Sequence, residues 1–198
     1  MKVLDLFSGL GGFSEAFVQS GHEVLRIENN PLLSEVPHTQ IIDIFEFRDI
    51  LLENIRRGHP IQRPDVILAS PPCREFSNAF NAPRAQAHRA GFDYEPDMKF
   101  VNVAKEIIDL LKPKWWIIEN VYGSRIYFEP ILGRPSQAIR PYILYGNYPK
   151  IPAGNYGNKK DKDQRHSPLR ANYRAQIPIE LSQALLCAIL EQQYIIDY

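Results

Sequence analysis

The chain has 198 residues and a formal net charge of zero, because 23 Lys and Arg residues balance 23 Asp and Glu residues. This length suits one domain with a substantial core, and a hydrophobic fraction of 44% is typical of a soluble globular protein. No apolar run has membrane-spanning length, the first residues do not resemble a signal peptide, and two cysteines are too few for a disulfide framework, so we expect a cytoplasmic protein without bound metal.

Short apolar runs alternate with helical patterns along the whole chain. Strands are predicted at residues 3–7, 23–27, 41–42, 65–69, 115–118 and 140–145, and helices at residues 13–20, 47–57, 98–111 and 179–195. This alternation predicts an α/β fold, with a mostly parallel sheet and helices on both faces, in a single domain over residues 1–198. In such a sheet, ligands bind beyond the carboxyl ends of the strands.

Five successive predicted strands end in polar or reactive residues. They are followed by the glycine-rich turn at residues 8–12, Glu28, Asp43, Cys73 and Glu119. Each feature has an ordinary structural interpretation on its own, as a tight turn, a helix cap, a small buried thiol or a solvated carboxylate. Because all five fall on the same edge of a parallel sheet, together they predict a ligand site.

The turn at residues 8–12 contains the run G-L-G-G, which lets backbone amides approach a ligand closely. An acidic residue at the end of the second strand, here Glu28, suits the two hydroxyls of a ribose. Asp43, after the third strand, is placed to accept a hydrogen bond from an exocyclic amine. These features indicate a cofactor that carries adenosine, and they leave open whether it is a dinucleotide or S-adenosylmethionine.

Three separate segments carry a family resemblance. Residues 5–12 read D-L-F-S-G-L-G-G, residues 71–73 read P-P-C and are followed by F-S at 76–77, and residues 119–121 read E-N-V. In order and spacing they resemble signature motifs of the DNA cytosine-C5 methyltransferases, over about residues 1–125. The resemblance implies a Rossmann-like methyltransferase fold, S-adenosylmethionine as methyl donor and DNA as substrate, with RNA as a further possibility.

The same resemblance assigns roles to individual side chains. Cys73 is expected to be the nucleophile that adds to C6 of cytosine, since a cysteine thiolate forms near neutral pH. Arg74 is expected to favour that thiolate or to contact a phosphate, Glu119 to hold or protonate the base at N3, and Arg140 to hold its O2 oxygen. The residues expected to line the cofactor pocket are Phe7, Gly9, Gly11, Gly12, Glu28, Asp43 and Pro71.

A cytosine stacked in a duplex cannot present C6 to a cysteine, so the nucleotide must be flipped out or already single-stranded. By resemblance, the loop at residues 74–97 closes over that base, and its interleaved Arg and Phe side chains suit phosphates and bases. The alternative is a mobile surface loop of ordinary composition. The residues expected to contact nucleic acid are Arg74, Ser77, Arg84, Arg89, Arg165 and Arg170.

The chain departs from the family pattern at four places. Arg74 stands where the family has Gln, residues 137–140 match the Gln-x-Arg-x-Arg motif only loosely, and A-Q-I-P at residues 175–178 replaces a late Gly-Asn-Ser-Val motif. The helix that follows is apolar enough to pack on the sheet, and we expect Cys187 in the core. A basic loop at residues 146–174 replaces the large target-recognition domain and is too short to build its own core.

Three hypotheses follow. The first is a compact, active DNA methyltransferase of relaxed sequence preference, from a restriction system, a virus or a mobile element. The second is a catalytic subunit that needs a DNA-recognition partner, which an exposed apolar patch near residues 126–150 would favour. The third is a cofactor-binding or DNA-binding relative without catalysis, which the retained Cys73 argues against. Enzymes that methylate adenine N6 or cytosine N4 are disfavoured, because they need an aromatic residue where this chain has Cys73.

Overall fold

The structure, a computed structural model, describes residues 1–156 and 166–196, so the predicted phosphate contact Arg165 lies outside the described residues. Seven strands form one sheet in the order β3-β2-β1-β4-β5-β7-β6. The strands are β1 (Lys2–Leu6), β2 (Glu23–Glu28), β3 (Thr39–Ile41), β4 (Val66–Ala69), β5 (Trp115–Val121), β6 (Gln137–Ile139) and β7 (Tyr142–Asn147). The α-helices are α1 (Glu15–Gln19), α2 (Ile44–Arg56), α3 (Pro83–Arg89), α4 (Lys99–Leu111), α5 (Arg125–Leu132), α6 (Arg170–Ala175) and α7 (Ile179–Ile196), and the 3-10 helices are η1 (Pro31–Leu33) and η2 (Tyr122–Ser124).

The sheet is parallel from β3 to β5, and β7 runs antiparallel to β5 with β6 antiparallel to β7. The predicted α/β class with a mostly parallel sheet is therefore confirmed. Because the parallel strands share one direction, the turns after β1, β2, β4 and β5 meet at the same edge.

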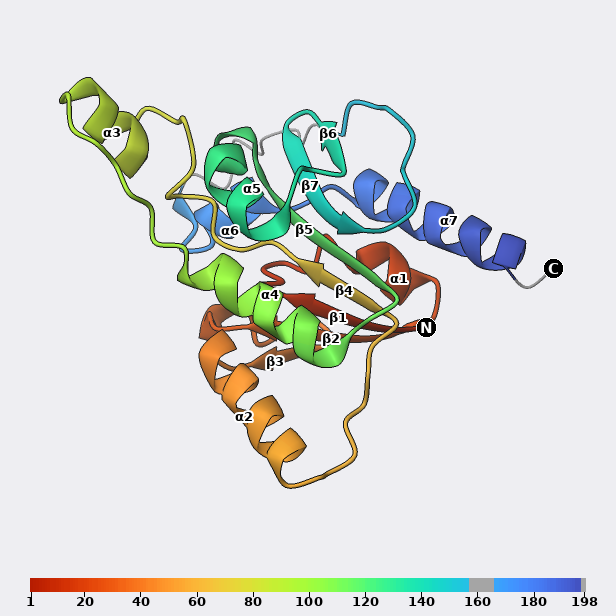
Figure 1. Cartoon of the computed structure of the whole chain (residues 1–198). Coiled ribbons are helices and arrows are strands. Elements are labelled where there is room, and N and C mark those ends of the chain that lie inside the picture. Colours follow the sequence, from red (N-terminus) through yellow and green to blue (C-terminus); the bar gives the residue numbers. More distant parts are fainter. Residues whose placement is uncertain (157–165, 197–198) are drawn as a thin grey trace.

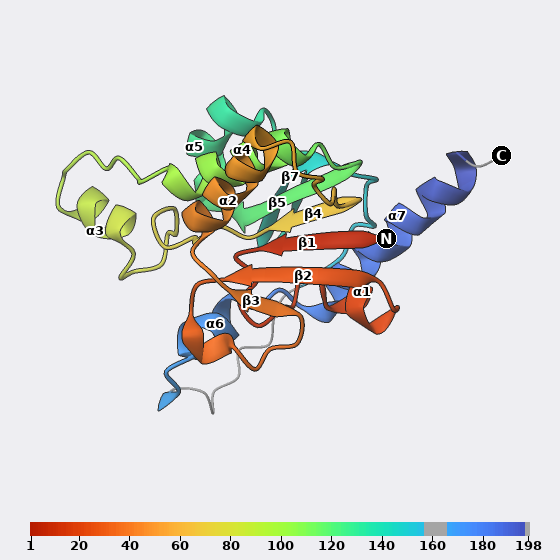
Figure 2. The ribbon, with the colours of Figure 1, turned by 90° about the horizontal axis from the view of Figure 1, so that it is seen from below.

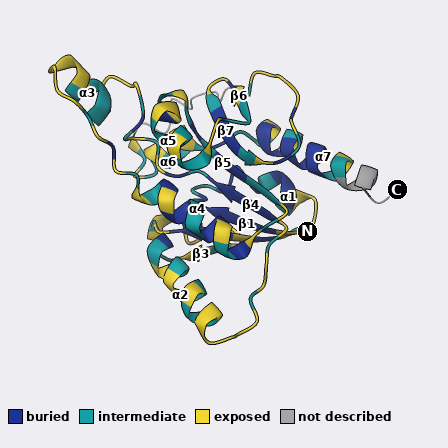
Figure 3. Ribbon diagram, in the orientation of Figure 1, coloured by how far each residue is buried: buried dark blue, intermediate teal, exposed yellow. Residues whose placement is uncertain are grey.

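Helices cover both faces of the sheet (Figures 1 and 2). α1 and α7 pack on one face, while α2, α4 and α5 lie on the other, and each layer has its own cluster of buried apolar side chains. β4 reads V-I-L-A and is buried at all four positions, as expected for a central strand covered on both sides. Figure 3 shows the contrast between these buried central strands and the exposed turns of α2 and α3.

Several predicted segments differ from the observed elements. The predicted loop at 74–97 contains α3, which begins at Pro83, where the fixed backbone of proline suits the first turn of a helix. The predicted strand at 140–145 corresponds to β7, which begins two residues later, and β6 is an additional strand just before the turn at Arg140 and Pro141. The predicted basic loop at 146–174 ends in α6.

The prediction that Cys187 is a core residue is wrong, because its side chain is exposed. Among the side chains of α7 that the structure describes, those at 181, 182, 185, 186, 188 and 189 are buried. A helix turns by about 100° per residue, so residue 187 points away from the face that packs on the sheet. Among the described residues, no helix is long and apolar enough to span a membrane.

Candidate active site

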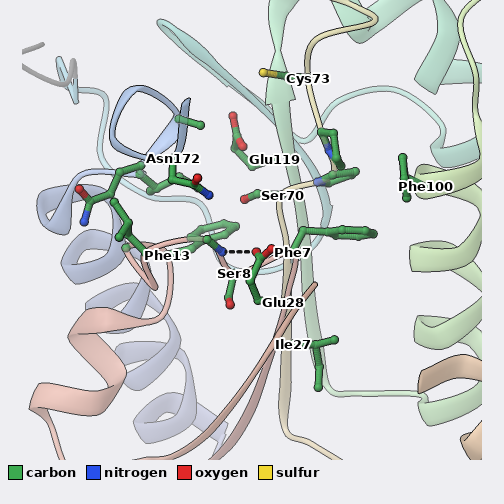
Figure 4. A pocket seen from close by; sticks show the side chains of 18 of the residues that line it. Phe7, Ser8, Phe13, Ile27, Glu28, Ser70, Cys73, Phe100, Glu119 and Asn172 are labelled. Atoms are coloured by element: carbon green, nitrogen blue, oxygen red, sulfur yellow. Dashed lines mark hydrogen bonds between the residues drawn. The ribbon is translucent and has the colours of Figure 1, made fainter. Parts of the chain in front are cut away.

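The turns at the carboxyl edge of the sheet enclose a cavity of about 400 Å³ (Figure 4). Its walls come from the glycine-rich turn after β1, the end of β2, the proline loop after β4, the end of β5 and the segment after α6. The predicted site residues that line it are Phe7, Gly9, Gly12, Glu28, Pro71, Cys73 and Glu119. Those that do not are Gly11, Asp43, Arg74, Ser77, Arg84, Arg89, Arg140 and Arg170.

Glu28 is fixed at the base of the glycine-rich turn by backbone hydrogen bonds. Its Oε2 accepts from the Gly9 amide at 2.8 Å, and its Oε1 accepts from the amides of Asn29 at 3.0 Å and Asn30 at 2.9 Å. Phe7 has a φ of 58°, a conformation that residues other than glycine rarely adopt, and it lines the cavity with Phe100. The turn is thus ordered before any ligand arrives.

Arg26 is a buried residue that the sequence reasoning missed, although a charged residue inside an apolar strand was a visible signal. Its guanidinium donates to the Gly11 carbonyl and to the Ser14 hydroxyl, both at 2.9 Å, and pairs with Glu15 at 2.9 Å. Gly11 has a φ of 77°, which favours glycine, and a Cβ there would lie 2.4 Å from that guanidinium carbon and displace it from its hydrogen bonds. Gly11 therefore supports the turn from beneath and does not line the cavity.

Aromatic and aliphatic side chains form the wall beside β2 and α4. The rings of Phe7 and Phe100 meet edge to face with centroids 5.8 Å apart, and Ile42 and Ile44 complete this apolar surface. Asp43 lies between them but is exposed, and its Oδ1 accepts from the Phe45 amide at 2.8 Å as the cap of α2. This geometry corresponds to the helix-cap interpretation of Asp43.

Cys73 and Glu119 lie on the opposite wall, on neighbouring strand ends (Figure 4). Burial raises the pKa of the Glu119 carboxyl to about 7, and the nearby Ser70 hydroxyl opposes that rise. Burial also raises the pKa of the half-buried Cys73 thiol, and the negative charge of Glu119 raises it further. The buried Asn120 amide donates to the Pro71 carbonyl at 2.9 Å and holds the proline loop against β5.

Arg74, which is expected to favour the Cys73 thiolate or to contact a phosphate, is not among the groups that shift the Cys73 pKa. Arg74 is exposed, and its charge acts on the Tyr94 phenol, where it opposes a rise in pKa to about 12 that burial and Glu75 cause. Without a substrate, the thiol is thus the favoured form of Cys73 near neutral pH.

Comparison with known proteins identifies the family. Residues 1–125 match the family described as C-5 cytosine-specific DNA methylase. The chain belongs to this family. Among curated relatives, the chain is 30% identical over 128 residues to the type II methyltransferase M.HgiGI of Herpetosiphon aurantiacus, covering 64% of this chain and 94% of the relative.

The other relatives are longer proteins. M.HindV of Haemophilus influenzae is 32% identical over 128 residues, covering 61% of this chain and 38% of its own length. M1.HphI of Haemophilus parahaemolyticus is 30% identical over 129 residues, which cover 61% of this chain and 32% of the relative. A solved structure of a DNA modification methyltransferase from an Escherichia coli prophage aligns at 19% identity and a TM-score of 0.43, over 66% of this chain and 35% of that one.

The segment that follows the cysteine in this DNA methylase chain is packed against η2 and α5. Phe76 is buried, with its ring centroid 4.9 Å from that of Phe128, and Arg84 donates to the Gly123 carbonyl at 2.9 Å. Ser77 accepts from the Ala79 amide at 3.1 Å. Arg89 is exposed and its guanidinium lies 4.0 Å from the centroid of the Phe80 ring. Of the predicted nucleic-acid residues in this segment, Arg89 and Arg74 face solvent, while Arg84 makes structural contacts.

The turn between β6 and β7 brings a further piece of the chain to the cavity. β7 pairs with β5 so that Tyr142 lies opposite Val121, and both residues line the cavity together with Pro141. Arg140, immediately before Pro141, is exposed at the rim and not inside. Arg170 begins α6 and is also exposed. Among the described residues, no group of three or more His, Cys, Asp and Glu side chains is placed to hold a metal ion.

Proposed function

We propose that this chain transfers a methyl group from S-adenosylmethionine to C5 of cytosine in DNA, through a covalent bond between Cys73 and C6. The observation that carries the proposal is the shared cavity. It places Cys73 and Glu119 on one wall, and the glycine-rich turn with Glu28 on the other. Family membership supplies the substrate class and the cofactor.

The residues present fit S-adenosylmethionine. The cavity volume falls in the range of small-molecule sites. The Glu28 carboxylate suits ribose hydroxyls, and the Phe7, Phe100 and Ile42 side chains suit an adenine ring. The buried Ser8 hydroxyl has no hydrogen-bond partner among the described residues, which supports a polar ligand in the cavity. When bound, this cofactor supplies an electrophilic methyl group on a sulfonium sulfur.

Cys73 and Glu119 divide the chemistry on the base. The Cys73 thiol gives up its proton to water and its sulfur forms a bond to C6, which moves the electron pair of the C5–C6 double bond towards C5. Glu119, with a pKa of about 7, carries a proton at neutral pH for a good part of the time and donates it to N3. After C5 has been methylated, loss of the C5 proton restores the double bond and expels the thiolate.

The DNA would approach over the exposed side of the segment at residues 74–97. Phe80 and Phe92 are each 73% exposed there, and Arg89 stacks on Phe80. Exposed aromatic rings beside arginines suit bases that have left the helix and the phosphates next to them. Arg74 at the cavity mouth offers a further cation for a phosphate.

The test is trapping with DNA that contains 5-fluorocytosine in place of cytosine. The C5 fluorine cannot leave as a proton does, so a protein–DNA adduct should accumulate and survive a denaturing gel. It should require S-adenosylmethionine, disappear in Cys73→Ser and persist in the matched control Cys187→Ser. The same oligonucleotide as RNA distinguishes the two polymer substrates. Cofactor binding without an adduct would exclude the covalent mechanism for the isolated chain.

A second candidate is a catalytic subunit that acts with a DNA-recognition partner. Tyr122 and Ile126, just after β5, are 59% and 63% exposed, which is unusual for large apolar side chains beside an active site. In this case the isolated chain would bind cofactor but form the adduct only with its partner. The retention of Cys73 and Glu119 in one cavity disfavours the third candidate, a relative without catalysis.

A further inference from the structure

A late segment of the chain forms one wall of the cavity. Asn172 and residues 174–177, which end α6 and follow it, line the cavity with the glycine-rich turn. A Cβ at Gly12 would lie 2.2 Å from the Ile177 carbonyl oxygen, so the two backbones are in direct contact. The late segment is therefore a fixed part of the site.

The helix after this segment is attached to the same turn. The Ser182 hydroxyl donates to the Phe13 carbonyl at 2.7 Å and accepts from the Ala16 amide at 3.1 Å, and all three residues are buried. On the other side, a Cβ at Gly9 would lie 3.8 Å from the Asn172 side-chain nitrogen. Figure 4 shows Asn172 on the side of the cavity opposite Phe100.

The charges of the cavity wall are unequally distributed. Two carboxylates, Glu28 and Glu119, line it, and Arg174 is its one cation among the described residues. Arg174 makes no hydrogen bond or ion pair with any part of the chain that the structure describes. Glu28, in contrast, already accepts three backbone hydrogen bonds.

S-adenosylmethionine has one anionic group, the carboxylate of its methionine moiety. A carboxylate that leaves water needs a partner, and an arginine can bind it with two parallel hydrogen bonds. We propose that Arg174 binds this carboxylate, with the Asn172 amide beside it. The inference rests on the proposed function, because it takes S-adenosylmethionine as the ligand.

The experiment compares ligands that differ in the carboxylate. Isothermal titration would measure Kd for S-adenosylhomocysteine, which keeps the amino-acid moiety, and for 5′-methylthioadenosine, which lacks it. Arg174→Ala should weaken S-adenosylhomocysteine about 10- to 100-fold, the usual range for a lost charge-assisted hydrogen bond, and leave methylthioadenosine unchanged. Arg174→Lys should retain part of the affinity.

Arg170→Ala is the matched control, since Arg170 and Arg174 are both exposed on the same helix but only Arg174 lines the cavity. It should change neither Kd. Equal losses for both ligands in Arg174→Ala would overturn the inference and make Arg174 a support of the wall, and no loss for either would overturn it as well. If the unmodified chain bound neither ligand, the proposed function itself would fail.

Discussion

Glu119 carries an electrostatic cost in the folded state, because its carboxylate is partly removed from water. Its pKa rises from 4.5 to about 7, so the folded state binds a proton more tightly than the unfolded state. This carboxyl therefore costs the fold nothing below about pH 4 and destabilises it increasingly as the pH rises from there to about 7.

Glu119→Gln should remove that cost. Relative to the unmodified chain, we expect the variant to gain on the order of 2 kcal/mol of unfolding free energy at pH 8 and almost nothing at pH 4. Urea unfolding at both pH values gives the comparison. Asp5, whose pKa is raised to about 6 by burial, titrates in both proteins and drops out of the difference. A gain of equal size at both pH values would contradict the assignment.

Cys73 is the proposed nucleophile, but in the free protein it should react with an alkylating reagent more slowly than Cys187. Cys187 is exposed, while Cys73 is half-buried with a raised pKa. Alkylation by iodoacetamide near pH 7.5 should modify Cys187 several times faster, because the thiolate is the reacting species. Mass spectrometry of peptides over a time course measures both rates. Faster modification of Cys73 would show that its thiolate is stabilised in the free protein.

Arg26 should be a stability residue. Its loss leaves the buried Asp5 carboxyl and the Ser14 hydroxyl without their cationic neighbour and removes the bond to the Gly11 carbonyl. Breaking a buried charge network costs about 3–5 kcal/mol, and we expect Arg26→Met to fall in that range in urea unfolding. Glu15→Gln, which alters the half-exposed partner, should cost less than about 1 kcal/mol. Similar costs for the two variants would contradict this account.

The two arginines of α3 should differ in role, with Arg84 supporting the structure and Arg89 contacting DNA. Arg84 is bonded to Gly123 and lies 5.5 Å from the Tyr127 ring centroid, whereas Arg89 is exposed on the other side of the helix. Arg89→Ala should weaken DNA binding and reduce the slope of log K against log salt by about one unit. Arg84→Ala should leave that slope nearly unchanged and make residues 74–97 more sensitive to limited proteolysis. Fluorescence anisotropy at several salt concentrations separates the two effects.

At the level of elements, strongly patterned segments were predicted well and short ones were not. β1, β2 and β4 carry clear apolar runs, and α4 has apolar residues at helical spacing, so local pattern and tertiary burial agree. β6 has three residues and pairs only with β7, so its identity depends on a tertiary contact that no local pattern encodes. α5 is absent from the predicted elements, and it contains Pro130, a residue that disfavours the interior of a helix.

The same distinction applies to the residues of the candidate site: some follow from strand order, and others depend on tertiary packing. Side chains at the ends of parallel strands, such as Cys73 and Glu119, were predicted because strand order alone brings them to one edge. Asp43 and Gly11 occupy the predicted turns, but packing directs them away from the cavity. Arg174 reaches the site because the segment after α6 packs on the glycine-rich turn, a contact distant in sequence that local spacing cannot show.

For the whole molecule, the segment between β7 and α6 sets the expected specificity. It spans residues 148–169, too short for an independent core, so phosphate contacts should dominate DNA binding. Given the proposed activity, bisulfite sequencing of a methylated pool with randomised flanks should show modified cytosines in many contexts. A single long consensus would instead require a reading surface that this segment can hardly provide.

The contact between Gly12 and Ile177 has a consequence for synthesis of the protein. The ribosome makes the glycine-rich turn about 165 residues before the wall that covers it, and contacts so distant in sequence form slowly. During synthesis, the part of the cavity formed by the glycine-rich turn therefore stays exposed until α7 has been made and has packed against α1. Binding of the methyl donor would then report that the glycine-rich turn and the segment after α6 have come together.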